Sequence, residues 1–325
     1  MKASGEARRR EKSGDCGGFG RFTAVSIRTS IIRVSAPDGN DQRLLHPQPP
    51  AETGETCSVN ARSALFDLYG DHLRSRGSRA PVASLVRLLA PLAITEPAVR
   101  TAVSRMARQG WLAPLPCGPG LAGYALTPRA ARRLDEAAER IYRRGEPAWD
   151  GQWHVLVVER IRDRARRARV RAALGYLGYA PLGDTTWISP RPSVELDPLL
   201  EAERLRAERF VASYDGDAHG LLARAWDLDG LARAYQRWLA LAGELVAAAG
   251  PDAPDPEVFA LRSALVHEWR KFLFTDPGFP AALLPPHWPG HEAARVFRTE
   301  SARLLPGASR FVDCCLRTDD PGSAP

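Results

Sequence analysis

The sequence contains few cysteines, almost no lysine and no long run of apolar residues. Its five cysteines include one adjacent pair and no C-x-x-C spacing, which argues against a zinc site or a redox pair, so we expect reduced, structural thiols. No stretch approaches the roughly 18 consecutive apolar residues of a membrane-spanning helix. The N-terminus lacks the apolar segment of a signal peptide. These absences argue against membrane and exported proteins and predict a cytoplasmic protein with no membrane partner.

Basic charge is concentrated in one part of the chain. The 325 residues carry a net charge of +7, and 42 of the 45 basic side chains are arginine. Residues 60–144 hold 14 arginines and six acidic residues, whereas residues 145–325 hold 22 basic and 25 acidic residues. A basic segment beside a mildly acidic remainder is typical of a nucleic-acid-binding module on a larger protein. The alternative is an arginine-rich solvated surface that reflects GC-rich coding.

Composition and periodicity divide the chain into five segments. The first mixes Gly, Ser, Pro and charge and predicts a disordered N-terminal extension. At Val59 the composition changes abruptly to dense helical periodicity, and one hypothesis is that translation begins there. The expected segments are an extension (1–59), a DNA-binding domain (60–144), a middle domain (145–215), a helical effector and dimerisation domain (216–317) and a tail (318–325).

Residues 60–144 predict the order helix, helix, helix, hairpin, helix. Apolar residues recur at helical spacing in two stretches, and Thr95, Pro97 and Gly110 then mark the start and the end of a third helix. Two short strands surround the turn at residues 118–120, and a fourth helix continues to about residue 144. This order is that of a winged helix-turn-helix domain.

The third helix has two distinct sides at about 100° per residue. One side is apolar and comprises Val99, Ala102, Val103 and Met106. The opposite side carries only arginines, hydroxyl groups and a proline, with no acidic residue: Pro97, Arg100, Thr101, Ser104, Arg105 and Arg108. In a major groove, arginine reads guanine edges or phosphates, and serine and threonine bind several base edges. A solvated face is the alternative, but such a face usually mixes both signs of charge. We therefore predict that these six residues contact DNA.

The remainder predicts a small sandwich followed by helices. The middle domain reads as strand, helix, strand, helix, strand, over residues 153–160, 163–177, 185–189, 197–206 and 210–214. This order suits a ferredoxin-like sandwich, and it contains no Gly-rich phosphate loop. Further helices are expected over residues 226–249, 257–274, 291–305 and 308–317. The expected fold class is thus α+β and mostly helical.

Several stretches resemble one protein family, in the same order along residues 60–316. They are NARSALFDLYGDHLRSRG (60–77), TEPAVRTAVSRMARQGWL (95–112), YALTPRAARRL (124–134), IYRRGEPAWDGQWHVLVV (141–158), TTWISP (185–190) and HEWRKFLFTDPGFPAALLPPHWPG (267–290). They are similar to the PaaX family, the repressors of phenylacetate catabolism and their relatives. The resemblance implies an N-terminal winged helix, a ferredoxin-like middle domain and an all-helical C-terminal domain. It also implies a homodimer on an inverted-repeat operator in double-stranded DNA, near the nucleoid, released by an acyl-CoA effector such as phenylacetyl-CoA.

One departure from the family concerns the hairpin. Wings in the family often carry arginine or lysine, whereas residues 116–123 here carry no charge. We therefore expect the third helix, more than the wing, to bear the DNA binding.

A basic cluster near residue 270 is a candidate effector site. On a helix, His267, Arg270 and Lys271 share the side opposite the apolar residues, and Trp269 adds an aromatic ring. Arginine and lysine clusters bind phosphates, of which a coenzyme A thioester carries several. An ordinary solvated or inter-domain face is the alternative, because the acyl group also needs an apolar pocket.

The rival class is an enzyme, a metal-dependent nucleic-acid hydrolase that uses the middle domain. Glu159 follows the first strand of that domain, where such an enzyme would need a carboxylate, but neighbouring arginines favour surface ion pairs. His287 and His291 are four residues apart, yet a Pro-Gly pair between them opposes a metal site on one helix. We therefore expect a DNA-binding repressor that is not an enzyme, without a cofactor or metal.

Overall fold

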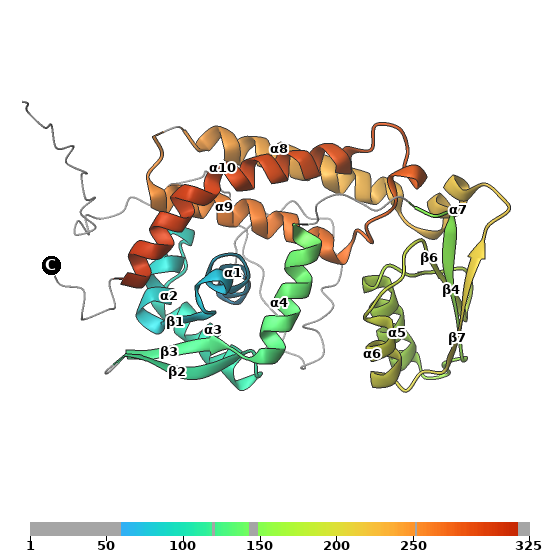
Figure 1. The fold of residues 1–325 in the computed structure, drawn as a ribbon, viewed down its shortest axis with the longest axis horizontal. Helices are drawn as coiled ribbons and strands as arrows, with labels where there is room; N and C mark the ends of the chain where they lie inside the picture. The colour runs from blue at the N-terminus through green and yellow to red at the C-terminus, as the bar shows by residue number, and fades with distance from the viewer. Residues whose placement is uncertain (1–59, 119–120, 143–148, 251, 318–325) are drawn as a thin grey trace, which may run out of the picture.

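The computed structural model describes residues 60–118, 121–142, 149–250 and 252–317. The expected N-terminal extension, the C-terminal tail and the last residues of the helix predicted to reach residue 144 lie outside the described residues. We name three parts of the described chain: the head (60–142), the middle region (149–216) and the helical region (217–317). In Figure 1 the helical region lies along the top, with the head below it on one side and the middle region on the other.

The head contains the predicted order of helices and hairpin. Its elements are α1 (Ala61–Leu68), a π-helical turn η1 (Tyr69–Leu73), 3-10 turns η2 (Arg74–Arg76) and η3 (Ala90–Leu92), α2 (Val82–Leu89), α3 (Glu96–Arg108), β2 (Leu112–Gly118), β3 (Leu121–Leu126) and α4 (Pro128–Ile141). A short strand, β1 (Arg79–Pro81), was not predicted, because three residues ending in proline give no strand pattern. It pairs antiparallel with β3, so the sheet order is β1-β3-β2.

Local side-chain chemistry fixes where the helices of the head begin. Before α1, the side-chain oxygen of Asn60 accepts a hydrogen bond of 2.9 Å from the Ser63 amide. Before α4, the Thr127 hydroxyl accepts one of 3.3 Å from the Ala130 amide. Both are N-cap contacts, which satisfy otherwise unpaired amides of the first turn. Thr95 occupies the expected N-cap of α3 in extended backbone, although its side chain makes no capping bond.

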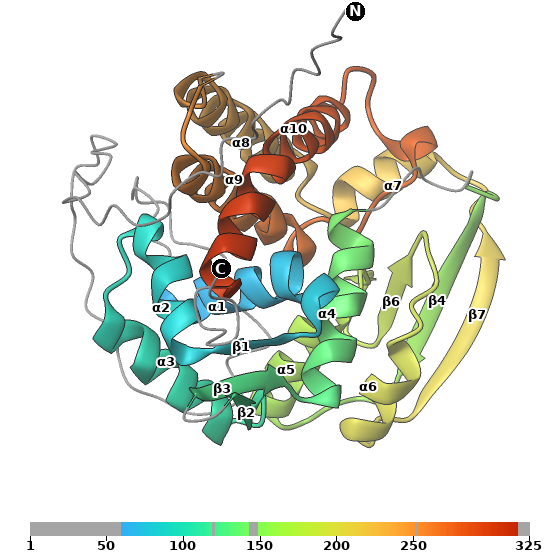
Figure 2. The ribbon, with the colours of Figure 1, turned by 60° about the vertical axis from the view of Figure 1, so that its left-hand side comes forward.

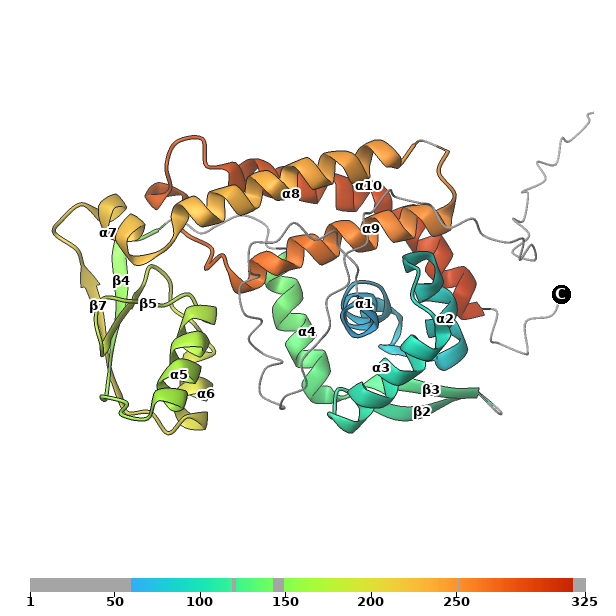
Figure 3. The same ribbon diagram turned by 180° about the vertical axis from the view of Figure 1, so that it is seen from behind.

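The middle region is a four-stranded antiparallel sheet with two helices on one face (Figures 1 and 3). Its elements are β4 (Gln152–Val158), α5 (Arg164–Tyr176), β5 (Ala180–Pro181), β6 (Thr186–Ser189), α6 (Leu196–Ala202) and β7 (Ala207–Ser213). The sheet order is β5-β6-β4-β7. The predicted strands and helices are present, and the short β5 completes the β-α-β-β-α-β order. Together with the head, this region confirms the α+β class.

The helical region corrects one prediction. Its elements are α7 (Ala218–Ala225), α8 (Leu228–Ala248), α9 (Asp255–Trp269), 3-10 turns η4 (Arg270–Phe274) and η5 (Ala281–Leu283), and α10 (Pro289–Arg317). The two helices expected after residue 290 are one continuous helix, α10, with Pro306 inside it. Proline removes one helical hydrogen bond and usually ends or bends a helix. Here the buried Gly307 and Ala308 keep both halves packed, and α10 bends instead of ending (Figure 1).

Three clusters of buried side chains form the core, and their membership crosses the predicted boundaries. The head cluster, which contains Leu65 and Met106, also includes Phe259 of α9 and Val312 of α10. The cluster of the helical region includes Trp153 and Ile188 from the sheet of the middle region. The third cluster lies wholly within the middle region. The head and the helical region therefore share one core.

The described residues also bear on the expectations about membrane-spanning helices and cysteines. None of the described helices is long and apolar enough to cross a membrane. Cys117 and Cys315 are not disulfide-bonded, but Cys314 takes part in a disulfide, so the expectation of reduced thiols fails at that position.

Candidate nucleic-acid interface

Helix α3 buries its apolar side against the head and leaves the other side open. Val99, Val103 and Met106 are at most 3% exposed. All six side chains that the sequence singled out are exposed, namely Pro97, Arg100, Thr101, Ser104, Arg105 and Arg108. Figure 3 shows α3 and the β2–β3 hairpin together on the side of the head away from α8 and α10. The helix thus presents a basic and hydroxyl-rich face at one edge of the molecule.

That face is less purely basic than the sequence indicated. Glu96, in the first turn of α3, is exposed and lies 2.7 Å from the guanidinium of Arg100. The expectation of a face without acidic residues is therefore wrong at this end. Both side chains are more than half exposed, and an exposed pair four residues apart is worth only about 0.3–0.5 kcal/mol. Arg100 can therefore exchange Glu96 for another anion at little cost.

The hairpin beside α3 has no room for a side chain at Gly123. A Cβ atom on Gly123 would lie 2.2 Å from the sulfur of Cys117 and 2.9 Å from the Ala80 carbonyl oxygen. The central strand β3 therefore requires glycine where β1 and β2 both approach it. Residues 119 and 120, at the predicted uncharged tip, lie outside the described residues. Arg79, which the sequence pattern did not single out, begins β1 at the base of the hairpin and is exposed.

The basic cluster of α9 lies against the head and not on an open surface. His267, which we expected opposite the buried side, is itself buried, and its Nδ1 lies 2.7 Å from an oxygen of Asp67 in α1. Arg270 Nε lies 2.7 Å from the other oxygen of Asp67. Lys271 Nζ lies 2.6 Å from Glu268. The face was misjudged because α9 has two packed sides, one toward α8 and α10 and one toward α1.

Trp269, the aromatic member of the proposed effector site, belongs to the core of the helical region. Its ring stacks on Phe297 with centroids 4.7 Å apart, and its Nε1 donates to the Ile141 carbonyl at 3.3 Å. The four predicted effector residues therefore occupy three different surroundings. Only Lys271 is exposed.

A second buried cluster, which the sequence did not predict, joins the head to α9. Arg262 of α9 forms an ion pair with Asp71, and its Nε donates to the Ser301 carbonyl at 3.1 Å. Asp71 also accepts a 2.5 Å hydrogen bond from the Tyr142 hydroxyl and lies 3.2 Å from His72. Asp67 and Asp71 are four residues apart on one helical face, which was the available signal. The head thus offers two carboxylates to two basic groups of α9, Arg262 and His267, and to Arg270 at the start of η4.

Burial shifts the ionisation of this cluster. Burial, assisted by the charge of Arg76 and opposed by Asp313, lowers the pKa of His72 to about 4. Burial also lowers the pKa of Arg262 to about 10 and raises that of Tyr142 to about 12. Desolvation disfavours the charged form in each case. His72 is therefore neutral at pH 7, while Arg262 stays charged.

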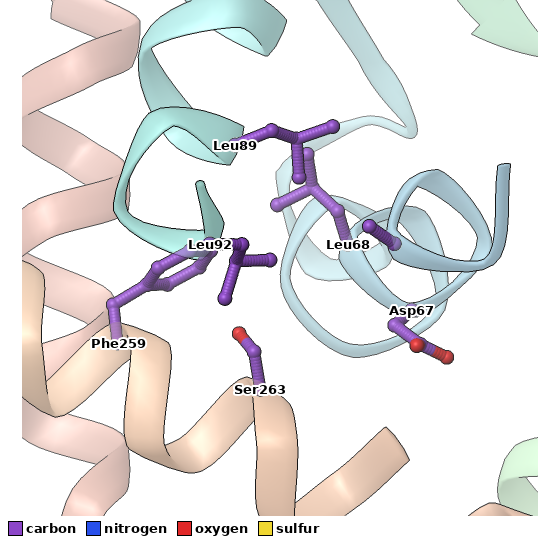
Figure 4. A pocket seen from close by; sticks show the side chains of 7 residues that line it. Asp67, Leu68, Leu89, Leu92, Phe259 and Ser263 are labelled. Carbon is purple, nitrogen blue, oxygen red and sulfur yellow. The ribbon is translucent and has the colours of Figure 1, made fainter. Parts of the chain in front are cut away.

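A small cavity marks the same junction (Figure 4). It is lined by residues of α1, α2, η3 and α9: Ala64, Asp67, Leu68, Leu89, Leu92, Phe259 and Ser263. Its volume is about 10 Å³, which is room for about one water molecule. The cavity cannot hold an acyl group in this conformation.

The carboxylate considered for nuclease chemistry lies on the surface. Glu159 is exposed, and its Oε1 lies 3.6 Å from Arg166 on α5. The expectation that Glu159 forms a surface ion pair is therefore confirmed. Among the described residues, no group of three or more His, Cys, Asp or Glu side chains is placed to hold a metal ion.

Comparisons with known proteins agree along the chain. Residues 60–130 match the family model described as PaaX-like protein, residues 146–221 the PaaX protein central Cas2-like domain, and residues 226–314 the PaaX-like protein C-terminal domain. The transcriptional repressor PaaX of Escherichia coli strain K12 is 30% identical over 270 residues, which cover 78% of this chain and 83% of that protein. The structure of the uncharacterized protein Rv0674 from Mycobacterium tuberculosis is similar with a TM-score of 0.55 and 26% identity, over 80% of this chain and 99% of that one.

Proposed function

The chain belongs to the PaaX family, and on that premise we propose that it is a sequence-specific DNA-binding transcriptional repressor, located in the cytoplasm with the nucleoid, and not an enzyme. The observation that carries this proposal is the exposed face of α3, which offers arginine and hydroxyl groups beside a hairpin. We assign residues 60–142 to a winged helix-turn-helix, in which α3 enters the major groove. The named repressor among the relatives supports this assignment.

The test is selection of bound duplexes from a random-sequence library, followed by footprinting of the selected sequence. We expect an enriched motif with protected guanines, because Arg100, Arg105 and Arg108 can bind guanine edges or neighbouring phosphates. Failure to enrich any motif, at a salt concentration where the protein stays folded, would refute the proposal.

We propose further that two copies bind an inverted repeat, paired through β7. This strand pairs with β4 along all seven of its residues and is the outer edge of the sheet (Figures 1 and 2). It contains no proline, and Phe210 and Val211 are 55% and 64% exposed on its two faces. The opposite edge, β5, is two residues long and ends in Pro181. Native proteins usually protect edge strands by shortness, proline or charge, and β7 has only Glu208 and Arg209.

Lysine at the exposed apolar positions tests this pairing. Phe210→Lys with Val211→Lys should leave the fold intact, since both side chains are exposed, and should convert a dimer to a monomer in sedimentation. A wild-type monomer at micromolar concentration, with and without DNA, would contradict the dimer. A variant that remains dimeric would exclude β7 as the interface.

For the effector we propose an aryl- or acyl-CoA thioester that competes with Asp67 for His267 and Arg270. Phosphate groups bind the same donors as a carboxylate, so the ligand can replace Asp67. Because Asp67 belongs to the head, this exchange would loosen the head from α9 and change how α3 is presented. A coupling of about 1–3 kcal/mol would weaken DNA binding about 5–150-fold.

Calorimetry with a panel of acyl-CoAs and free acids, with and without operator, tests this mechanism. Asp67→Asn should bind the anionic ligand more tightly and DNA more weakly than wild type, whereas Glu268→Gln, beside Lys271, is the matched control. If no ligand of the panel binds, or if Asp67→Asn binds DNA as wild type does, the effector proposal fails.

A further inference from the structure

Seven arginines are concentrated between residues 160 and 171 of the middle region, with Asp163 as the one acidic residue among them. Helix α5 buries Val170 and Leu174 against the sheet. Its outward side carries arginines at spacings of three and four residues, and the preceding loop adds two more. We name as the arginine stripe five exposed arginines of this segment: Arg160, Arg162, Arg164, Arg167 and Arg171.

The two arginines outside the stripe have structural partners. Arg166 donates to the Glu203 carbonyl at 2.7 Å and lies 3.6 Å from Glu159. Arg169 lies 3.3 Å from the Glu203 carboxylate. These contacts join α5 to the segment that follows α6. Arg166 and Arg169 therefore serve the fold of the middle region.

The stripe itself has few partners within the molecule, one of which is the Ile161 carbonyl, to which Arg167 Nη1 donates at 3.1 Å. The Asp163 carboxylate is engaged as the N-cap of α5, where it accepts from the Arg166 amide at 2.6 Å. Arg160 lies 3.8 Å from Asp184, but both side chains are at least 80% exposed. In the described part of the chain, Arg162, Arg164 and Arg171 have no carboxylate within ion-pairing distance. Like charges three and four residues apart on a helix repel each other, so the stripe is better suited to an external anion than to the stability of α5.

The stripe lies on the same side of the molecule as α3. The C-terminal end of α5 touches the helical region, since the Tyr176 and Phe274 rings are 5.8 Å apart and Gly178 approaches Pro277. The N-terminal end, where the stripe begins, therefore points away from the helical region. In Figures 1 and 3 this lower end of α5 faces the same side as α3 and the hairpin, and α5 lies between the head and the sheet.

We propose that the arginine stripe binds the phosphate backbone of the same DNA duplex, beyond the base pairs that α3 contacts. This inference rests on the proposed function. Duplex DNA carries one negative charge per roughly 1.7 Å of its axis and offers a regular row of anions to such a helix. Phosphate contacts position a protein but carry no sequence information. The stripe therefore adds affinity and salt dependence and leaves sequence discrimination to α3.

The experiment compares two triple variants that remove the same charge. Arg164→Gln, Arg167→Gln and Arg171→Gln remove the centre of the stripe. The matched control replaces Arg233, Arg237 and Arg298 by Gln, which are exposed on α8 and α10 along the opposite side of the molecule. Fluorescence anisotropy measures affinity for a duplex selected by the wild-type protein, between 50 and 200 mM salt. Each phosphate contact contributes about 0.9 to the slope of log affinity against log salt.

We expect the stripe variant to lose about 2–3 units of that slope and to keep the wild-type ratio of affinities for selected and scrambled duplexes. On a short duplex limited to the bases protected by α3, it should bind as wild type does. Two outcomes would contradict phosphate binding by the stripe. One is a wild-type salt slope of the stripe variant on the long duplex, and the other is an equal loss of salt slope on the short duplex. Failure of the wild-type protein to bind any duplex would instead overturn the proposed function.

Discussion

The head and the middle region are attached to the helical region in different ways. The head shares a core with α9 and α10 and adds two ion pairs, the buried pair of Asp71 with Arg262 and the partly buried pair of Asp67 with Arg270. The middle region keeps a core of its own; two of its buried residues, Trp153 and Ile188, join the core of the helical region, and Trp149 and Val155 pack against that core. Close-packed interiors transmit displacement, because they have few voids to absorb it. A shift of α9 therefore reaches the head directly, and the middle region is the more independent module.

The strongest test of this difference removes one aromatic side chain from the shared core. Phe259 is 1% exposed, and its ring packs against His72 and Phe311. Phe259→Ala should lower the free energy of unfolding by about 3–5 kcal/mol. Hydrogen exchange should then increase together in α1–α3 and in α9–α10.

Leu174→Ala is the matching change in the core of the middle region, where Leu174 is fully buried. It should cost about 2–5 kcal/mol and increase exchange in α5 and its sheet alone. If Phe259→Ala instead loosens the helical region and leaves the head protected, the two do not form one unit.

Removing the buried charge of Arg262 also tests whether the head is attached more tightly to the helical region than the middle region is. Arg262→Met leaves the Asp71 carboxylate buried without its main cationic partner, and such a change typically costs about 3–5 kcal/mol. A second substitution, Asp71→Asn, should recover part of this loss. The control is Arg209→Met, which breaks the exposed pair with Asp197 in the middle region and should change the unfolding midpoint very little. Equal effects of the two arginine substitutions in denaturant titrations would contradict the buried junction.

Acid should weaken the shared core more than the middle region, where burial lowers the pKa of the less deeply buried His154. The pKa of His72 is lowered to about 4 in the folded protein, against about 6.5 in an unfolded chain. Between these values the unfolded state binds more protons, so the free energy of unfolding falls as the pH falls. The loss reaches up to about 3 kcal/mol by pH 4. His72→Gln should flatten this dependence between pH 6.5 and 4, and an unchanged pH profile would exclude His72 as its source.

The smallest effects are expected on the open face of α3. Arg100→Ala should cost about 1–3 kcal/mol at one base pair if Arg100 reads a guanine, and it should relax discrimination there. Arg108, near the other end of α3, should act through a phosphate. Its loss should weaken binding to all sequences and reduce the salt slope by about one unit. A footprint and sequence preference that do not change in Arg100→Ala would contradict the assignment.

Local signals predicted most of the helices and the two longer strands that pair in the head. The two strands that were missed, β1 and β5, contain three and two residues and end in Pro81 and Pro181. Strands of this length have no periodicity of their own, and they exist because a longer neighbour provides hydrogen-bonding partners. At Pro306 the sequence predicted a helix end that the structure does not contain. Proline ordinarily ends a helix, but α10 packs on α9 and continues past this residue.

The sequence by itself determined the order of most helices and of the longer strands, the apolar and basic sides of α3 and the concentration of positive charge in the head. These features depend on residues close together in the same helix or strand, so hydrophobic periodicity and capping residues are enough to predict them. The tertiary structure alone decided that His267 and Arg270 meet Asp67, that Arg262 meets Asp71, and that the head and the helical region share a core. A helical pattern specifies which side is buried, but not which helix about 200 residues away covers it.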